Sequence, residues 1–247
     1  MTNSWEEKLR KTDWLIDQIV YKLYGERVMA SFFQKYGDEI EFGNAKDLRI
    51  KFSEINCSVP EATKGRTTDH RERYCLKYYL EELVKKEKLT FPLKVKKEES
   101  PDFLITMDNG VKIGLEVTEG TTPEYQRKIK EFEKRFKKNG IGYEFIGPWV
   151  DGAPECKWTE IIVMRIKEKL EKLNQSRFKS ANRYELLIYD NNDLTLPVRI
   201  EEALPMLRKK LCDVLRNFKK IFDSISILTP QGRKEQLLYD ILKDKNC

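Results

Sequence analysis

Residues 99–119 read ESPDFLITMDNGVKIGLEVTE, and they carry the clearest structural signal in the sequence. Two runs that are mostly apolar, 102–107 and 111–118, flank the turn sequence Asp108-Asn109-Gly110. Short apolar runs bounded by Asn, Asp and Gly are typical of strands joined by a tight turn. The stretch therefore predicts a β-hairpin, and the remaining question is its register.

A three-residue loop, built as a type I turn closed by a left-handed glycine, gives the preferred register. It places every apolar pair on one face, whereas a two-residue Asn-Gly turn would divide the apolar side chains between both faces. In the preferred register the Cβ atoms of Asp102 and Glu116 lie roughly 5 Å apart. The apolar pairs are Met107 with Val111, Ile105 with Ile113 and Phe103 with Leu115; the other face pairs Thr106 with Lys112, Leu104 with Gly114 and Asp102 with Glu116.

The facing carboxylates of Asp102 and Glu116 are the first candidate site. Two like charges opposite each other repel, and a divalent cation would relieve the repulsion. Mg²⁺ commonly binds one or two carboxylates and keeps several waters. The alternative is an ordinary hairpin with two acids on a solvated face.

Elements predicted around the hairpin give an α/β fold, a mixed sheet flanked by helices. A helical N-terminal extension is expected over 1–65, with a helix at 5–35 followed by an irregular stretch. A core domain follows over 66–247, with a helical insertion at about 121–156. The predicted core helices are 69–87, 123–138, 159–174 and 201–220, and the further strands lie at about 91–95, 184–190 and 225–228.

Composition limits the function without naming it. Lys and Arg outnumber Asp and Glu by 47 to 41, a formal net charge of +6, which is compatible with a polyanionic partner but does not require one. Five cysteines without close spacing indicate neither a disulfide framework nor a zinc site, and His70 alone gives no support for a Ser-His or Cys-His nucleophile. With no signal-like apolar segment and no run long enough to cross a membrane, a cytoplasmic protein without membrane contact is expected.

A family resemblance rests on two segments, Ser100-Pro101-Asp102-Phe103-Leu104-Ile105 and Gly114-Leu115-Glu116-Val117-Thr118. Together they resemble the core motif of the PD-(D/E)XK nuclease superfamily. The resemblance implies a restriction endonuclease-like core with the order α-β-β-β-α-β, Mg²⁺ or Mn²⁺ held by Asp102 and Glu116, and hydrolysis of phosphodiester bonds in DNA or RNA. It also implies a homodimer, since many such enzymes are dimers.

One position departs from the pattern, which has lysine where Thr118 stands. In some members of the superfamily that lysine lies on the next core helix. Here Lys169 falls within the apolar stripe of helix 159–174, and a lysine on an inward face needs a partner. The resemblance gives it the role of orienting the attacking water or of neutralising charge in the transition state. The alternative is a lysine whose amine reaches solvent past the apolar stripe.

Further acids are candidates on similar grounds. Glu72 lies on the inward stripe of helix 69–87, and members of the superfamily often place a glutamate there near the metal. The alternative is a surface glutamate favoured by the helix dipole. Glu99 and Glu119 flank the motif and either assist the pair or are simply exposed.

A basic helix offers a surface for nucleic acid. Lys128, Lys130, Lys134 and Arg135 could contact the phosphate backbone, or they could form a solvated face interleaved with glutamates. The expected function is therefore a metal-dependent nuclease acting on nucleic acid, most simply DNA. The alternatives are a nuclease-like protein that binds nucleic acid without cutting it, and a protein-interaction or scaffolding domain.

Overall fold

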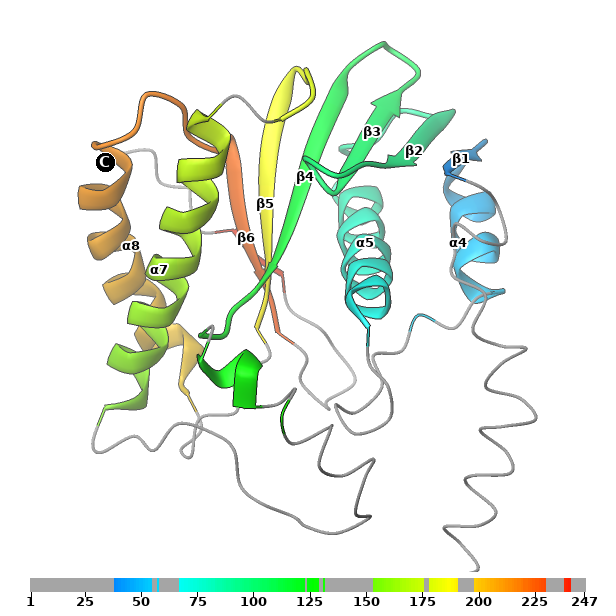
Figure 1. Ribbon diagram of the computed structural model, residues 1–247. Coiled ribbons are helices and arrows are strands. Elements are labelled where there is room, and N and C mark those ends of the chain that lie inside the picture. Colours follow the sequence, from blue (N-terminus) through cyan, green and yellow to red (C-terminus); the bar gives the residue numbers. More distant parts are fainter. Residues whose placement is uncertain are drawn as a thin grey trace, which may run out of the picture.

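The molecule has three layers, with helices on both sides of a central sheet (Figure 1). A computed structural model describes residues 38–54, 57, 67–122, 124–128, 131, 153–175, 178–190, 198–229 and 238–240. Helices α4 and α5 cover one face of the sheet, and α7 and α8 cover the other (Figure 1). Their bounds are α4 Ala45–Ser53, α5 Thr68–Lys85, α7 Pro154–Asn174 and α8 Ile200–Leu215.

The sheet has seven strands, which lie side by side in chain order. β4 pairs parallel to β5 and β5 parallel to β6, while every other pair is antiparallel. The predicted class, a mixed sheet flanked by helices, is therefore confirmed. The bounds are β1 Glu39–Phe42, β2 Leu93–Lys97, β3 Phe103–Met107, β4 Lys112–Glu119, β5 Arg183–Tyr189, β6 Ser224–Leu228 and β7 Leu238–Asp240.

The β3–β4 hairpin has the predicted three-residue turn. Gly110 has a φ of 78°, and its amide donates to the Met107 carbonyl at 2.9 Å. The Met107 amide in turn donates to the Val111 carbonyl at 2.9 Å, which closes the loop in the expected register. The paired residues run outward from Thr106 with Lys112 to Phe103 with Leu115, as predicted.

The two faces of β4 contribute to different layers. Ile113 and Leu115 are buried in the core under α4 and α5. Successive side chains alternate across a strand, so Gly114, Glu116 and Thr118 face the side on which α7 and α8 pack. Beyond Leu115 the pairing with β3 stops, while β4 continues beside β5 to Glu119. This parting of β3 and β4 leaves room for side chains along the last half of β4.

Gly114 keeps this region closely packed. A Cβ atom there would lie 2.9 Å from Pro101 Cγ and 2.9 Å from Tyr184 Cδ1. We expect Gly114→Ala to lower the free energy of unfolding by about 1–3 kcal/mol, because ring atoms on both sides must shift. Urea unfolding measures the loss, and Gly43→Ala is the control because its nearest atom lies 3.9 Å away. Equal losses for the two variants would contradict this prediction.

Two predicted boundaries were wrong. The stretch predicted as irregular contains β1, which pairs with β2, and α4, whose N-cap Asn44 accepts a hydrogen bond from the Asp47 amide. The described part of the expected N-terminal extension is thus part of the sheet layer and its covering helix. Helix α7 begins at Pro154 rather than at 159, because proline suits the first helical position. The helix predicted at 5–35 lies outside the described residues, as does most of the insertion at 121–156.

Two findings bear on the setting of the protein. In the part of the chain that the structure describes, we find no helix both long and apolar enough to cross a membrane. Cys57, Cys75 and Cys156 are free thiols, whereas Cys212 is disulfide-bonded. Disulfides are uncommon in the cytosol, so the bond at Cys212 does not support a cytoplasmic location. The cytoplasmic location therefore stays a prediction.

Candidate functional site

The carboxylates of Asp102 and Glu116 lie where β3 and β4 part. Asp102 directly precedes the first paired residue of β3, and its Oδ2 accepts a hydrogen bond from the Val117 amide at 2.6 Å. Glu116 is on β4 and is only 4% exposed. The hairpin thus brings together the two acids that its sequence predicted as neighbours.

The electrostatics of Asp102 reflect this crowding. Burial and the nearby negative charge of Glu116 raise the pKa of Asp102 to about 7, against the opposing effects of the Val117 amide and the Lys169 charge. A carboxyl group with a raised pKa beside a second acid is characteristic of a site that gains from a cation. The pair is therefore held at an electrostatic cost that a bound ion would remove.

Lys169 supplies a positive charge from the opposite layer. Its Nζ forms an ion pair and hydrogen bond with Glu116 Oε1, and the lysine is only 9% exposed. The second oxygen, Glu116 Oε2, is buried and accepts no hydrogen bond from any described residue. Lys169 thus meets the carboxylate pair rather than reaching out to solvent, and Oε2 keeps a free acceptor in a buried position.

Glu72 lies near the pair but has a partner of its own. Its Oε2 is 2.6 Å from Nζ of Lys97, which also lies 3.5 Å from Asp69 Oδ1. The Glu72 charge contributes to the raised pKa of Asp102, so the two groups interact electrostatically. The role of Lys97, at the end of β2, was not predicted from the sequence. This strand ends in two lysines, and its sequence does not indicate which of them faces α5.

Thr118, at the departure from the family pattern, contacts an arginine. Arg165 Nη2 donates to Thr118 Oγ1 at 2.8 Å, and Arg165 Nε donates to the Glu119 carbonyl at 3.0 Å. Sequence reasoning missed Arg165. The available signal was its position four residues before Lys169, which puts both on one face of α7.

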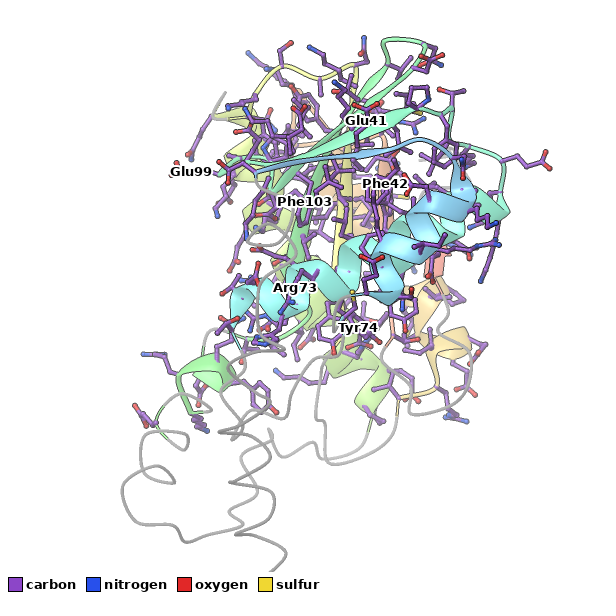
Figure 2. The ribbon with its side chains drawn as sticks, turned by 90° about the vertical axis from the view of Figure 1, so that its right-hand side faces the viewer. Glu41, Phe42, Arg73, Tyr74, Glu99 and Phe103 are labelled. Atoms are coloured by element: carbon purple, nitrogen blue, oxygen red, sulfur yellow. The ribbon has the colours of Figure 1, made fainter. Side chains whose placement is uncertain are left out.

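The flanking acids have separate surroundings. Glu119 is buried, forms an ion pair with Arg71 of α5 and accepts a hydrogen bond from Gln126 Nε2 at 2.9 Å. Glu99 is exposed. Figure 2 shows it at the left margin of the molecule, whereas Phe103 lies further inside. Neither Glu119 nor Glu99 contacts the carboxylate pair through any described interaction.

Little of the predicted basic helix can be placed. Residues 124–128 are helical, and the exposed Lys128 lies 3.0 Å from Glu124 in an ion pair. Lys130, Lys134 and Arg135 lie outside the described residues. The role of this helix in binding nucleic acid stays a prediction.

The donor set limits which cation would fit. Among the described residues no group of three or more His, Cys, Asp or Glu side chains is arranged to hold a metal. Two carboxylates, one with an unused buried oxygen, fit a hard ion such as Mg²⁺ or Mn²⁺, which takes oxygen ligands and keeps its own waters. They do not fit zinc, which in structural sites takes four protein ligands and in catalytic sites usually three.

Comparisons with protein-family models, with curated proteins and with solved structures gave no match.

Proposed function

We propose that this protein is a metal-dependent nuclease that hydrolyses phosphodiester bonds of DNA or RNA. The observation that carries the proposal is the triad of Asp102, Glu116 and Lys169. Two adjacent carboxylates and one buried ammonium come from a hairpin and a helix on different layers. A scaffold gains little stability from such an arrangement, because burying charges is costly even when they are paired.

Each residue has a chemical role in this proposal. Asp102 and Glu116 would hold Mg²⁺ or Mn²⁺, and such an ion lowers the pKa of a bound water and offsets charge on the scissile phosphate. Glu116 fixes the Lys169 ammonium beside the pair, where it would stabilise negative charge that develops on the phosphate. The Val117 amide holds Asp102 in place through its hydrogen bond at 2.6 Å.

The order of elements supports the same proposal. Along the chain α5, β2, β3, β4, α7 and β5 follow one another, which is similar to the α-β-β-β-α-β core of restriction endonuclease-like proteins. Asp102 directly precedes the second strand of this series, Glu116 lies in the third, and Lys169 lies in the second helix. Residues 120–153 would then be an insertion between β4 and α7.

The test is cleavage of single- and double-stranded DNA and RNA with Mg²⁺ or Mn²⁺. We expect cleavage by the wild type and a loss of at least about 10³-fold in Asp102→Asn, since a metal ligand and its charge are removed while the shape is kept. Glu99→Gln, an exposed acid three residues away, is the matched control and should retain full activity. Equal activity in wild type and Asp102→Asn would exclude the proposed site.

A second candidate function is binding of nucleic acid without cleavage. The observation that favours it is Thr118, which supplies no ammonium at the position where the family pattern has lysine. Metal-dependent binding with no cleavage of any substrate would support this candidate. Neither binding nor cleavage would support a protein-interaction or scaffolding domain.

A further inference from the structure

Arg165 of α7 is, after Lys169, a second cation that contacts β4. Its Nε and Nη2 donate to the Glu119 carbonyl and to Thr118 Oγ1, and its Nη1 forms an ion pair with Glu168. A guanidinium carries five N–H donors. These three hydrogen bonds therefore leave two donors with no partner among the residues that the structure describes.

The position of Arg165 connects it to the carboxylate pair. Thr118, which it contacts, lies two residues after Glu116 on the same face of β4. Arg165 itself lies one helical turn before Lys169, on the same face of α7. Arg165 and Lys169 thus form a line of two cations along β4, and this line begins at the proposed metal ligands.

Glu168 is the outer partner of Arg165. The Glu168 side chain is 40% exposed and the Arg165 side chain is 14% exposed, so their ion pair lies at the rim of the site. Because the Glu168 carboxylate is partly exposed, water screens this ion pair and reduces the free energy that it contributes. A stronger anionic ligand could therefore replace Glu168 at small cost, whereas the bonds to β4 would hold the guanidinium in place.

We propose that Arg165 is a substrate-binding residue that binds a backbone phosphate of the nucleic acid next to the scissile one, and that this phosphate replaces Glu168. The inference rests on the proposed function. Arginine suits this role because its planar fork of donors matches phosphate oxygens in a bidentate way. The Thr118 hydroxyl and the Glu119 carbonyl fix the orientation of the fork before the ligand arrives.

The experiment compares the salt dependence of binding. A fluorescein-labelled DNA duplex is titrated with full-length protein in Ca²⁺, anisotropy is recorded at several salt concentrations, and a gel verifies that the probe stays intact. We expect Arg165→Ala to weaken binding about tenfold and to reduce the slope of log K against log salt by about one, as the loss of one phosphate contact requires. Glu168→Gln should strengthen binding about threefold by removing the competing anion.

Two variants separate this role from a purely structural one. Arg216→Ala is the matched control, because Arg216 also pairs with an acid three residues away, Asp213, but at the C-terminal end of α8. It should change neither affinity nor slope. The second variant is Arg165→Ala/Thr118→Lys, in which the new lysine would place a cation in the space that Arg165 occupied. It should recover most of the wild-type slope of log K against log salt.

The outcomes distinguish this inference from the proposed function. If the wild type cleaves and Arg165→Ala binds with the wild-type slope, the inference fails and the proposed function stands. If the wild type binds but does not cleave, the proposed function fails and the slopes still decide the role of Arg165. If Arg165→Ala only lowers thermal stability, with affinity and slope unchanged, Arg165 is a structural link between α7 and β4. Absence of duplex binding by the wild type overturns the inference, and absence of cleavage of every DNA and RNA substrate overturns the proposed function.

Discussion

Lys169→Met is expected to reduce the proposed metal-dependent cleavage by at least about 100-fold, because the ammonium that would stabilise charge on the scissile phosphate is lost. It should also lower the free energy of unfolding by about 3 kcal/mol, since Glu116 is then a buried carboxylate without a counter-charge. Methionine matches the length and shape of lysine, so the loss reflects charge rather than a cavity.

The two effects of Lys169→Met should separate in a second variant. In Lys169→Met/Glu116→Gln both members of the buried pair are neutral, and most of the lost stability should return while cleavage stays absent. Divalent cations supply a further test. Mg²⁺ should stabilise Lys169→Met more than the wild type, because the cation then replaces the lost ammonium next to Glu116.

Urea unfolding with and without Mg²⁺ measures the stabilities, and single-turnover cleavage measures the rate. Lys172→Met, at an exposed position of the same helix, is the control and should match the wild type in both. Wild-type cleavage in Lys169→Met would remove Lys169 from the mechanism. A loss of cleavage without any loss of stability would mean that Glu116 is not buried against Lys169.

Asp102→Asn is expected to stabilise the metal-free protein at pH 8 by about 4 kcal/mol, since one unit of pKa corresponds to roughly 1.4 kcal/mol. The folded pKa of Asp102 is raised from 3.8 to about 7, so folding favours the protonated carboxyl. Its contribution to stability is therefore fully present below about pH 4 and is lost as the pH rises through 7. Asparagine stays neutral and avoids this loss.

The measurement is urea unfolding in EDTA at several pH values between 4 and 8. The difference between Asp102→Asn and the wild type should grow with pH, and Mg²⁺ should reduce it by stabilising only the wild type. Asp108→Asn, an exposed aspartate in the turn of the same hairpin, should leave the pH dependence unchanged. If the stability difference between Asp102→Asn and the wild type is constant across this pH range, the pKa of Asp102 is not raised by its surroundings.

The hairpin and Lys169 were predictable because they depend on local periodicity. Alternating apolar side chains on two strands and one turn sequence were enough to fix the register, and that register makes Asp102 and Glu116 neighbours. The apolar stripe of α7 likewise marked Lys169 as the lysine that faces inward. Both predictions use residues whose spacing directly determines the face on which they lie.

Other parts of the site depend on contacts between distant elements. Lys97 and Arg165 acquire their roles only when β2 meets α5 and α7 meets β4. The helical spacing of Arg165 from Lys169 indicates a shared face of α7, but it does not indicate which groups of β4 that face contacts. The strand β1 has only four residues, so its alternating pattern was too short to separate from a loop. These features come from tertiary packing, which no window of sequence contains.

The strand order also has a consequence for how the site assembles. Since β3 and β4 are adjacent in the chain, their hairpin needs no later segment to bring the two acids together. Parallel pairing of β5 with β4 requires a crossover connection, and that connection includes α7 with Lys169. During synthesis the acids therefore emerge first, and their counter-charge arrives with the same crossover that completes the centre of the sheet. A folding intermediate that lacks α7 would carry an uncompensated negative pair, so docking of this helix and completion of the site are one event.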